Sequence, residues 1–208
     1  MPPLKVLLAL LAAGWWGCCQ ALGAVPPPPE QGTANCSNPT YASDQLVCAD
    51  PDLLALDRRM VVLLAEASPA GPGSPLHWFE PQPDWFRRRS LCAFSERHAA
   101  CLIAAYSERI DLLAALAGRA SGQTRPAFLA TCPGAPWGNG PVRLHQPDPS
   151  PLSIQDGRGR LLVLASALQP QDDWSPFVRI GNDARGIRLE PPGGSVVRCR
   201  ALPVRLNP

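Results

Sequence analysis

Cysteine placement constrains this chain more than any other feature of its sequence. Six of its eight cysteines follow residue 24, and by spacing they form three groups: Cys36 and Cys48, Cys92 and Cys101, Cys132 and Cys199. An even number of cysteines in an exported chain is typical of a disulfide framework, although the sequence alone does not select the pairing. Zinc ligation is disfavoured, because no C-x-x-C pair follows residue 24 and the three histidines are scattered. We therefore expect structural disulfides, no metal ion and no cofactor.

The first 24 residues have the pattern of a signal peptide. A single cation, Lys5, precedes an apolar run over residues 6–17, and small residues end the segment at Ala24. The run is shorter than the ~20 residues of a membrane-spanning helix, and a plausible cleavage site follows it after Gly23 or Ala24. The pattern predicts an exported protein, periplasmic or secreted.

Cys18 and Cys19 leave an alternative open, in which the chain is anchored by a lipid on one of these cysteines. The residues before Cys18, Trp15-Trp16-Gly17, fit that signal poorly, because it uses a small aliphatic residue three places upstream. Beyond the leader no window approaches ~18 consecutive apolar residues, so we expect no transmembrane span in the mature chain.

The charge balance excludes two classes of protein. The chain has 19 basic and 17 acidic side chains, a formal net charge of +2. This excludes a polybasic nucleic-acid binder and a charge-driven disordered tail, and the short run Arg87-Arg88-Arg89 is no nucleic-acid footprint. Proline is abundant, with 26 residues, and its run within residues 25–34 predicts a stiff linker.

Residues 35–118 have a helical pattern. Asp50 and Pro51 predict a helix start, and apolar residues from Leu53 to Leu64 recur at helical spacing until the Pro/Gly-rich residues 68–75. Two more helices are expected. The first covers about residues 85–92, opened by Asp84, with Trp85, Phe86 and Leu91 directed inward; the second covers about 96–117, capped by Ser95 and ended by Gly118.

From residue 121 onward the pattern is that of short β-strands. Apolar runs separated by Gly, Pro, Asn and Asp turns occur at residues 142–144, 160–164, 177–180, 186–189 and 195–199. A Cys132–Cys199 bond would close nearly all of this segment. The sequence therefore predicts an α+β protein, in which a small disulfide-stapled helical domain (35–118) precedes a small all-β module (125–204).

The helical segment resembles a known family in three blocks. These are LVCADPDL at 46–53 followed by Leu56-Asp57, Q-x-x-W-F-x-x-R-x-x-C at 82–92, and C-L-x-x-x-Y-x-x-R-I at 101–110. Their order and internal spacing are similar to the N-terminal domain of the lysozyme-inhibitor LprI-like family, small helical exported bacterial proteins. The resemblance covers about residues 35–117. Leu64 departs from the family's usual Tyr, and Pro81 and Pro83 interrupt the approach to the second block.

The resemblance gives a set of residues structural roles: Asp50, Pro51, Leu56, Asp57, Gln82, Trp85, Arg89, Tyr106 and Arg109. We favour local disulfides, Cys36–Cys48 and Cys92–Cys101, with crossed pairing as the alternative. Trp85 and Tyr106 are expected in the core. Arg89 and Arg109 are expected to form inter-helix ion pairs with Asp57, Glu96 or Glu108, with a partner-facing role as the alternative.

The resemblance implies a binding protein that blocks the cleft of a lysozyme or another peptidoglycan hydrolase. Residues 25–120 carry a net charge of −3 and residues 121–208 carry +4, so the acidic half is the one that resembles the inhibitor. Glu80, Gln82 and Asp84 are the expected partner-facing residues. The alternative is a non-inhibitory envelope adaptor that binds another exported protein. An enzyme is not expected, because no catalytic residues are assigned and no G-x-S-x-G, H-E-x-x-H or P-loop occurs.

Overall fold

The structure is a computed structural model that describes residues 32–67, 76–118, 127–145, 151–167 and 173–203. All of them belong to one compact unit. The expected signal peptide, Cys18, Cys19 and nearly all of the linker lie outside the described residues. In the part of the chain that is described, no helix is long and apolar enough to cross a membrane.

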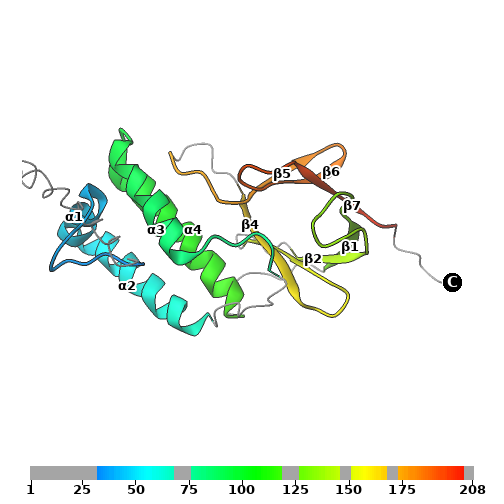
Figure 1. The fold of residues 1–208 in the computed structure, drawn as a ribbon, viewed down its shortest axis with the longest axis horizontal. Helices are drawn as coiled ribbons and strands as arrows, with labels where there is room; N and C mark the ends of the chain where they lie inside the picture. Colours follow the sequence, from blue (N-terminus) through cyan, green and yellow to red (C-terminus); the bar gives the residue numbers. More distant parts are fainter. Residues whose placement is uncertain (1–31, 68–75, 119–126, 146–150, 168–172, 204–208) are drawn as a thin grey trace, which may run out of the picture. The chain divides into compact units, whose positions relative to one another are not determined.

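The architecture is α+β, as predicted, with the helices in the N-terminal half (Figure 1). The helical elements are α1 (Ala42–Ala49), α2 (Pro51–Glu66), α3 (Gln82–Ser90), the 3₁₀ turn η1 (Leu91–Phe94) and α4 (His98–Leu116). Asp50 caps α2 as expected, because its carboxylate accepts from the backbone N–H groups of Asp52 and Leu53 at 2.9 and 3.2 Å. Helix α1 ends one residue before this cap and was not predicted.

Two helix starts differ from the prediction. Helix α3 begins at Gln82 rather than after Asp84, because Pro83 lies in its first turn, where a missing N–H costs nothing. Helix α4 begins at His98 rather than Glu96, with Arg97 in the capping position. The hydroxyl of Ser95 accepts from the Arg97 N–H at 3.0 Å and bonds to Asp173, so it stabilises the turn before the helix.

Seven strands form a closed barrel in chain order: β1 (Phe128–Thr131), β2 (Val142–His145), β3 (Leu152–Gln155), β4 (Leu161–Ala167), β5 (Arg179–Asp183), β6 (Gly186–Glu190) and β7 (Val197–Ala201). Neighbours are antiparallel except β4 and β5, which are parallel. Five strands overlap the predicted runs, whereas β1 and β3 were missed. Both have four residues, too few for a clear alternating pattern.

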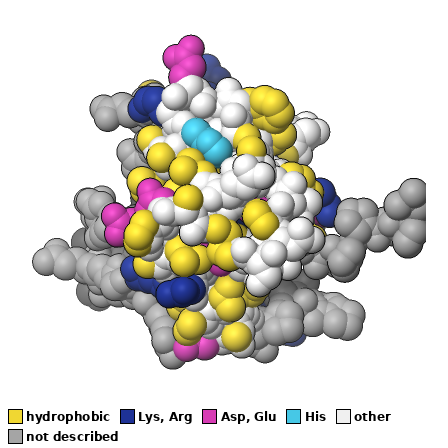
Figure 2. Space-filling model, turned by 90° about the vertical axis from the view of Figure 1, so that its left-hand side faces the viewer, with side chains coloured by type: hydrophobic (Ala, Val, Ile, Leu, Met, Phe, Trp, Pro, Cys, Tyr) yellow, Lys and Arg dark blue, Asp and Glu magenta, His cyan; other side chains and the backbone are white. Residues whose placement is uncertain are grey.

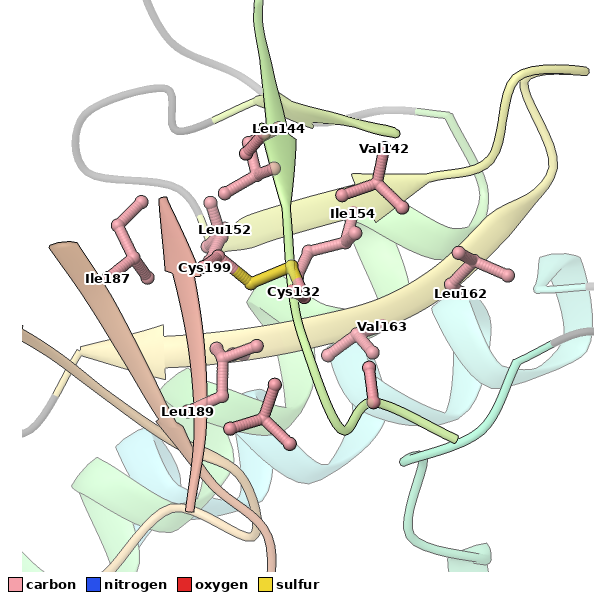
Figure 3. Packing of buried hydrophobic residues seen from close by; sticks show 14 of the residues in the cluster. Cys132, Val142, Leu144, Leu152, Ile154, Leu162, Val163, Ile187, Leu189 and Cys199 are labelled. Atoms are coloured by element: carbon pink, nitrogen blue, oxygen red, sulfur yellow. A yellow bond between two sulfur atoms is a disulfide. The ribbon is translucent and has the colours of Figure 1, made fainter. Parts of the chain in front are cut away.

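The barrel interior is filled by alternate side chains of its strands, except in β4, where residues 162–165 are all buried. Leu144, Ile154, Val163 and Leu189 are completely buried. Figure 3 shows these side chains gathered around the Cys132–Cys199 disulfide, whose sulfur atoms join the segment after β1 to β7. Period-two burial and one disulfide therefore define this core.

A second hydrophobic core lies among the helices. Trp85 of α3 and Tyr106 of α4 meet edge to face, with ring centroids 5.4 Å apart, and both are buried as predicted. Trp174, from the connection between β4 and β5, is also buried in this helical core.

The segment before α3 contacts the barrel. The His77 N–H donates to the carbonyl of Leu162 at 2.8 Å, and Trp78 forms a parallel bridge with Val163 of β4. The Trp78 ring packs edge-on against Trp137 at 5.1 Å. These aromatic residues thus help to join the helices to the barrel.

Candidate interaction site

The six cysteines of the described residues form the three disulfides favoured from the sequence, two of them between nearby residues and the third, Cys132–Cys199, across a separation of 67 residues. Cys36–Cys48, Cys92–Cys101 and Cys132–Cys199 have S–S distances of 2.05, 2.00 and 2.01 Å. The crossed pairing is therefore excluded in this structure. The first bond ties the segment before α1 to the end of that helix, and the second ties η1 to α4.

Asp57 is the centre of the first polar cluster inside the helical core. Its carboxylate accepts from the Tyr106 hydroxyl at 2.9 Å, from the Thr33 hydroxyl at 2.7 Å and from the Ala34 N–H at 3.3 Å. Burial, the largest cause, raises the pKa of Tyr106, and the neighbouring Asp57 raises it further. Tyr106 therefore stays a protonated donor and joins α4 to α2.

Arg89 forms a different ion pair from those expected. Its guanidinium lies 2.7 Å from the carboxylate of Asp44, and both side chains are completely buried. It also stacks over the Phe86 ring at 4.1 Å. The expected partners were Asp57, Glu96 or Glu108. The actual partner is on α1, the helix that the sequence did not reveal.

Arg109 binds amide and carbonyl oxygens. It donates to Gln82 Oε1 at 2.8 Å and to the Glu80 carbonyl at 3.0 Å, and burial lowers its pKa to about 10. Gln82 in turn donates to the Gly32 carbonyl at 2.5 Å and to Met60 Sδ at 3.2 Å. The expected carboxylate ion pair is absent from the described contacts of Arg109.

The three residues expected to face a partner lie in different environments. Glu80 is buried, and both of its carboxylate oxygens are bound by Arg88, at 2.8 and 2.7 Å. Gln82 is committed to Arg109 and Gly32, as above. Asp84 is exposed and pairs with Arg87 on the same helix. Of the three, Asp84 alone presents its side chain to solvent without an interior role.

Ser43 and His98 form a hydrogen bond that runs in the opposite direction to the one between a serine nucleophile and its general base. The completely buried Ser43 hydroxyl donates to the Ser90 carbonyl at 3.1 Å, so His98 Nε2, at 3.1 Å, must donate to it. Burial, and secondarily Arg89, lowers the pKa of His98. Within the described ranges, no group of three or more His, Cys, Asp or Glu side chains could hold a metal ion.

The turn η1 exposes two large apolar side chains. Phe94 is 87% exposed and Leu91 is 60% exposed, whereas Leu91 was expected to face inward. Cys92 lies between them and is buried, bonded to Cys101 of α4. Glu96 follows two residues after Phe94, is exposed, and forms no ion pair with any described residue. We call Leu91–Glu96 the η1 ridge.

A groove of about 650 Å³ lies beside the η1 ridge. Its lining includes Arg88, Leu91 and Phe94 from the helical half and Trp174, Phe177 and Pro192 from the C-terminal half. Arg88 stacks over the Trp174 ring at 3.9 Å and donates to the Ser175 carbonyl at 2.6 Å. The groove is thus lined by aromatic rings, prolines and the Arg88 guanidinium.

Glu108 holds Trp174 in place beneath this groove. The indole N–H of Trp174 donates to Glu108 Oε2, and the other oxygen, Oε1, is buried without a hydrogen-bond partner. Burial raises the pKa of Glu108, and its hydrogen bond to Trp174 and the charge of Arg88 oppose that shift.

Figure 2 views the molecule from the α1 end of the helices, where η1 packs against α1. Figure 2 shows hydrophobic and uncharged side chains interspersed over this face, with a histidine among them and charges of both signs mostly toward its margin. Such a mixture offers neither a continuous apolar patch nor a field of one sign. The η1 ridge and its groove form the candidate interaction site because Leu91 and Phe94 are exposed there beside an apolar, aromatic groove.

Sequence reasoning missed this ridge because Leu91 and Phe94 look like core residues beside a helix. The signal that could have found them is Cys92, whose disulfide fixes one residue inward and forces its neighbours outward. No family model, curated protein or solved structure matches the chain. The resemblance to the LprI-like family therefore rests on the motif residues alone.

Proposed function

We propose that this protein is an exported, non-enzymatic binding protein of the cell envelope that blocks the cleft of a lysozyme or another peptidoglycan hydrolase. The observation that carries the proposal is the η1 ridge, on which Phe94 is 87% exposed beside a disulfide. The likeness of the three motif blocks to the LprI-like family supplies the class of target.

The ridge has the properties of an inhibitory wedge. Binding costs less entropy when the inserted segment is already rigid, and the Cys92–Cys101 bond holds this turn against α4. Aromatic side chains that enter a pocket carry a large share of interface energy. A nearly fully exposed phenyl ring on a fixed turn supports a role as an anchor in a cleft.

Charge favours a cationic target. The described residues of the helical half include ten acidic side chains and seven arginines. The Glu96 carboxylate on the ridge forms no ion pair with a described residue. Animal-type lysozymes are strongly cationic, so an acidic ligand would be steered toward them and its binding would weaken with salt. Glu96 takes the place of Glu80 and Gln82 as the polar group offered to the target.

Export is supported by covalent chemistry. Three disulfides fit an oxidising compartment outside the cytosol. We propose a periplasmic or secreted protein released from the leader, with lipid attachment at Cys18 or Cys19 as the alternative. Intact-mass measurement of the protein from its native host separates the two, because a lipidated cysteine adds acyl mass.

A second candidate function, an envelope adaptor, is favoured by the groove. Its lining of aromatic rings and prolines could receive an extended segment of another exported protein. In that case Phe94 would rim the binding groove, and no hydrolase would be inhibited.

The test is lysis of peptidoglycan by an animal-type lysozyme, with the oxidised mature protein titrated in at two salt concentrations. We expect saturable inhibition that weakens at the higher salt concentration. Phe94→Ser should raise the inhibitor concentration needed about tenfold or more. Val62→Ser on α2 is the matched control, since Val62 is 56% exposed and lies outside the ridge.

The outcomes separate the two functions. Equal inhibition by both variants would overturn the η1 ridge as the wedge. No inhibition by the wild type at tens of micromolar would overturn the lysozyme proposal and leave the adaptor.

A further inference from the structure

Four arginines project from the outer surface of β5, β6 and β7, the orange-to-red strands of Figure 1. Burial alternates along these strands: Ile180, Ile187, Leu189, Val197 and Cys199 are buried in the barrel. The residues between them, Arg179, Arg188, Arg198 and Arg200, therefore face outward. We call these residues the arginine face. It belongs to the barrel and includes no residue of the η1 ridge.

Cross-strand pairing places two of these positively charged side chains next to each other. Arg188 of β6 stands directly opposite Arg198 of β7. Such cross-strand pairs of like charge are destabilising, so their presence needs a compensating interaction.

Two carboxylates compensate only part of this charge. Glu190 bridges Arg179 and Arg188 at 3.0 and 2.8 Å, and Asp183 lies 3.6 Å from Arg198 Nε. Arg200 is exposed and forms no ion pair with a described residue. Four guanidinium groups against two carboxylates leave an excess of two positive charges on three adjacent strands.

The arginines remain accessible. The side chains of Arg179, Arg188 and Arg198 are 45, 42 and 41% exposed despite their ion pairs. A guanidinium has five N–H donors, and one contact to a carboxylate oxygen leaves most of them unused. The face therefore presents free charged donors to solvent.

Two glycines shape this surface. Gly181 stands opposite Arg188, and a Cβ there would lie 3.6 and 3.7 Å from its guanidinium nitrogens, so Arg188 lies across β5. Gly186 has φ +123°, and a Cβ there would lie 2.3 Å from the Cys199 carbonyl, which only glycine avoids. Gly181 thus lets the Arg188 side chain lie across β5, and Gly186 allows β6 to approach β7 closely.

We propose that the arginine face binds an acidic glycan, a linear polysaccharide that carries carboxylate groups. Adjacent strands lie ~4.8 Å apart and alternate residues along a strand ~6.8 Å apart, so the guanidinium groups can engage successive anionic groups of one extended polymer. Arginine and carboxylate form paired, charge-assisted hydrogen bonds.

Two other anionic partners, a nucleic acid and a lipid surface, would need recognition elements that these strands do not offer. The described residues of β5, β6 and β7 include no aromatic side chain on which a nucleic-acid base could stack. They also present no amphipathic helix that would insert into a lipid surface. A regularly charged glycan needs neither.

The test is binding of the mature protein to polygalacturonate, with dextran as the uncharged polymer. Arg188→Gln/Arg198→Gln should weaken binding about tenfold or more, because each lost charged hydrogen bond removes a large part of the interaction. Arg143→Gln/Arg158→Gln is the matched control: it removes the same charge from β2 and the β3–β4 turn, and we expect a change of less than about twofold. Unchanged melting temperatures verify that each variant is folded.

Three results would overturn the proposal: no binding of the wild type to polygalacturonate, equal weakening in both double variants, or tighter binding to anionic phosphatidylglycerol vesicles or single-stranded DNA. Lysozyme inhibition is measured in parallel. The arginine variants should leave it unchanged, so the two proposals succeed or fail separately.

Discussion

At the residue scale, the family-like motif positions of the helical half are mostly interior residues. Asp57, Gln82, Arg89, Tyr106 and Arg109 form hydrogen bonds with one another or with neighbouring elements rather than with solvent. The Asp57–Tyr106 bond joins α2 to α4, the Gln82–Arg109 bond joins α3 to α4, and Arg89 joins α3 to α1 through Asp44, so the motif specifies how the helices pack. It does not specify a binding surface, which explains why the predicted partner-facing residues were largely misplaced.

The Asp44–Arg89 pair gives a stability prediction. Arg89→Met leaves the Asp44 carboxylate buried and unpaired, and we expect a loss of about 3–5 kcal/mol in the free energy of unfolding. The double variant Asp44→Asn/Arg89→Met also removes the unpaired carboxylate charge, so it should recover part of that loss. Urea denaturation measures both. A single variant within about 0.5 kcal/mol of the wild type would contradict the role assigned to this pair.

Glu108 gives a prediction about pH. Its folded-state pKa is raised above the ordinary 4.5, so the folded protein binds a proton more readily than the unfolded chain. Stability therefore falls as the pH rises from about 4.5 through the folded pKa. Glu108→Gln keeps an acceptor for Trp174 but cannot ionise, so its stability relative to wild type should increase over that range. Melting temperatures from pH 4 to 7 test this, and parallel curves for the two proteins would contradict it.

At the element scale, strong local signals were predictive and short elements were not. The cap at Asp50, the periodicity after Leu53, the continuous apolar run of β4 and the alternating run of β6 each identified an element. Helix α1 has eight residues and the strands β1 and β3 have four, so tertiary contacts decide their conformation. The Cys92–Cys101 disulfide was favoured from the sequence, but the exposed side chains that it places on η1 were not predicted.

The disulfides should differ in their contribution to stability. In the loop-entropy account, removing Cys92–Cys101, with a separation of nine residues, costs about 2.5 kcal/mol, and removing Cys132–Cys199, with a separation of 67, costs about 4 kcal/mol. Paired Cys→Ala variants compared by denaturation measure this order.

The shorter loop should matter more for binding, because it fixes the η1 ridge. A Cys92→Ala/Cys101→Ala variant that binds its target as well as wild type would show that the ridge needs no rigid support.

At the scale of the whole molecule, the two halves carry opposite charge on different surfaces. Residues 25–120 have a net charge of −3 and residues 121–208 a net charge of +4, and this asymmetry is visible in the sequence. The structure adds where the charges lie: Glu96 on the η1 ridge, and the arginines on the outside of β5, β6 and β7. Sequence alone could not predict this, because the register of the barrel decides which arginines share a face.

The central claim is that the η1 ridge occupies a hydrolase cleft, and competition for that cleft tests it most directly. Affinity for an animal-type lysozyme is measured alone and with the cleft filled by a chitooligosaccharide. If the ridge enters the cleft, the apparent dissociation constant rises in proportion to the oligosaccharide concentration, and Phe94→Ser removes the binding that the oligosaccharide competes for. An affinity that stays constant while the cleft is saturated would contradict the claim.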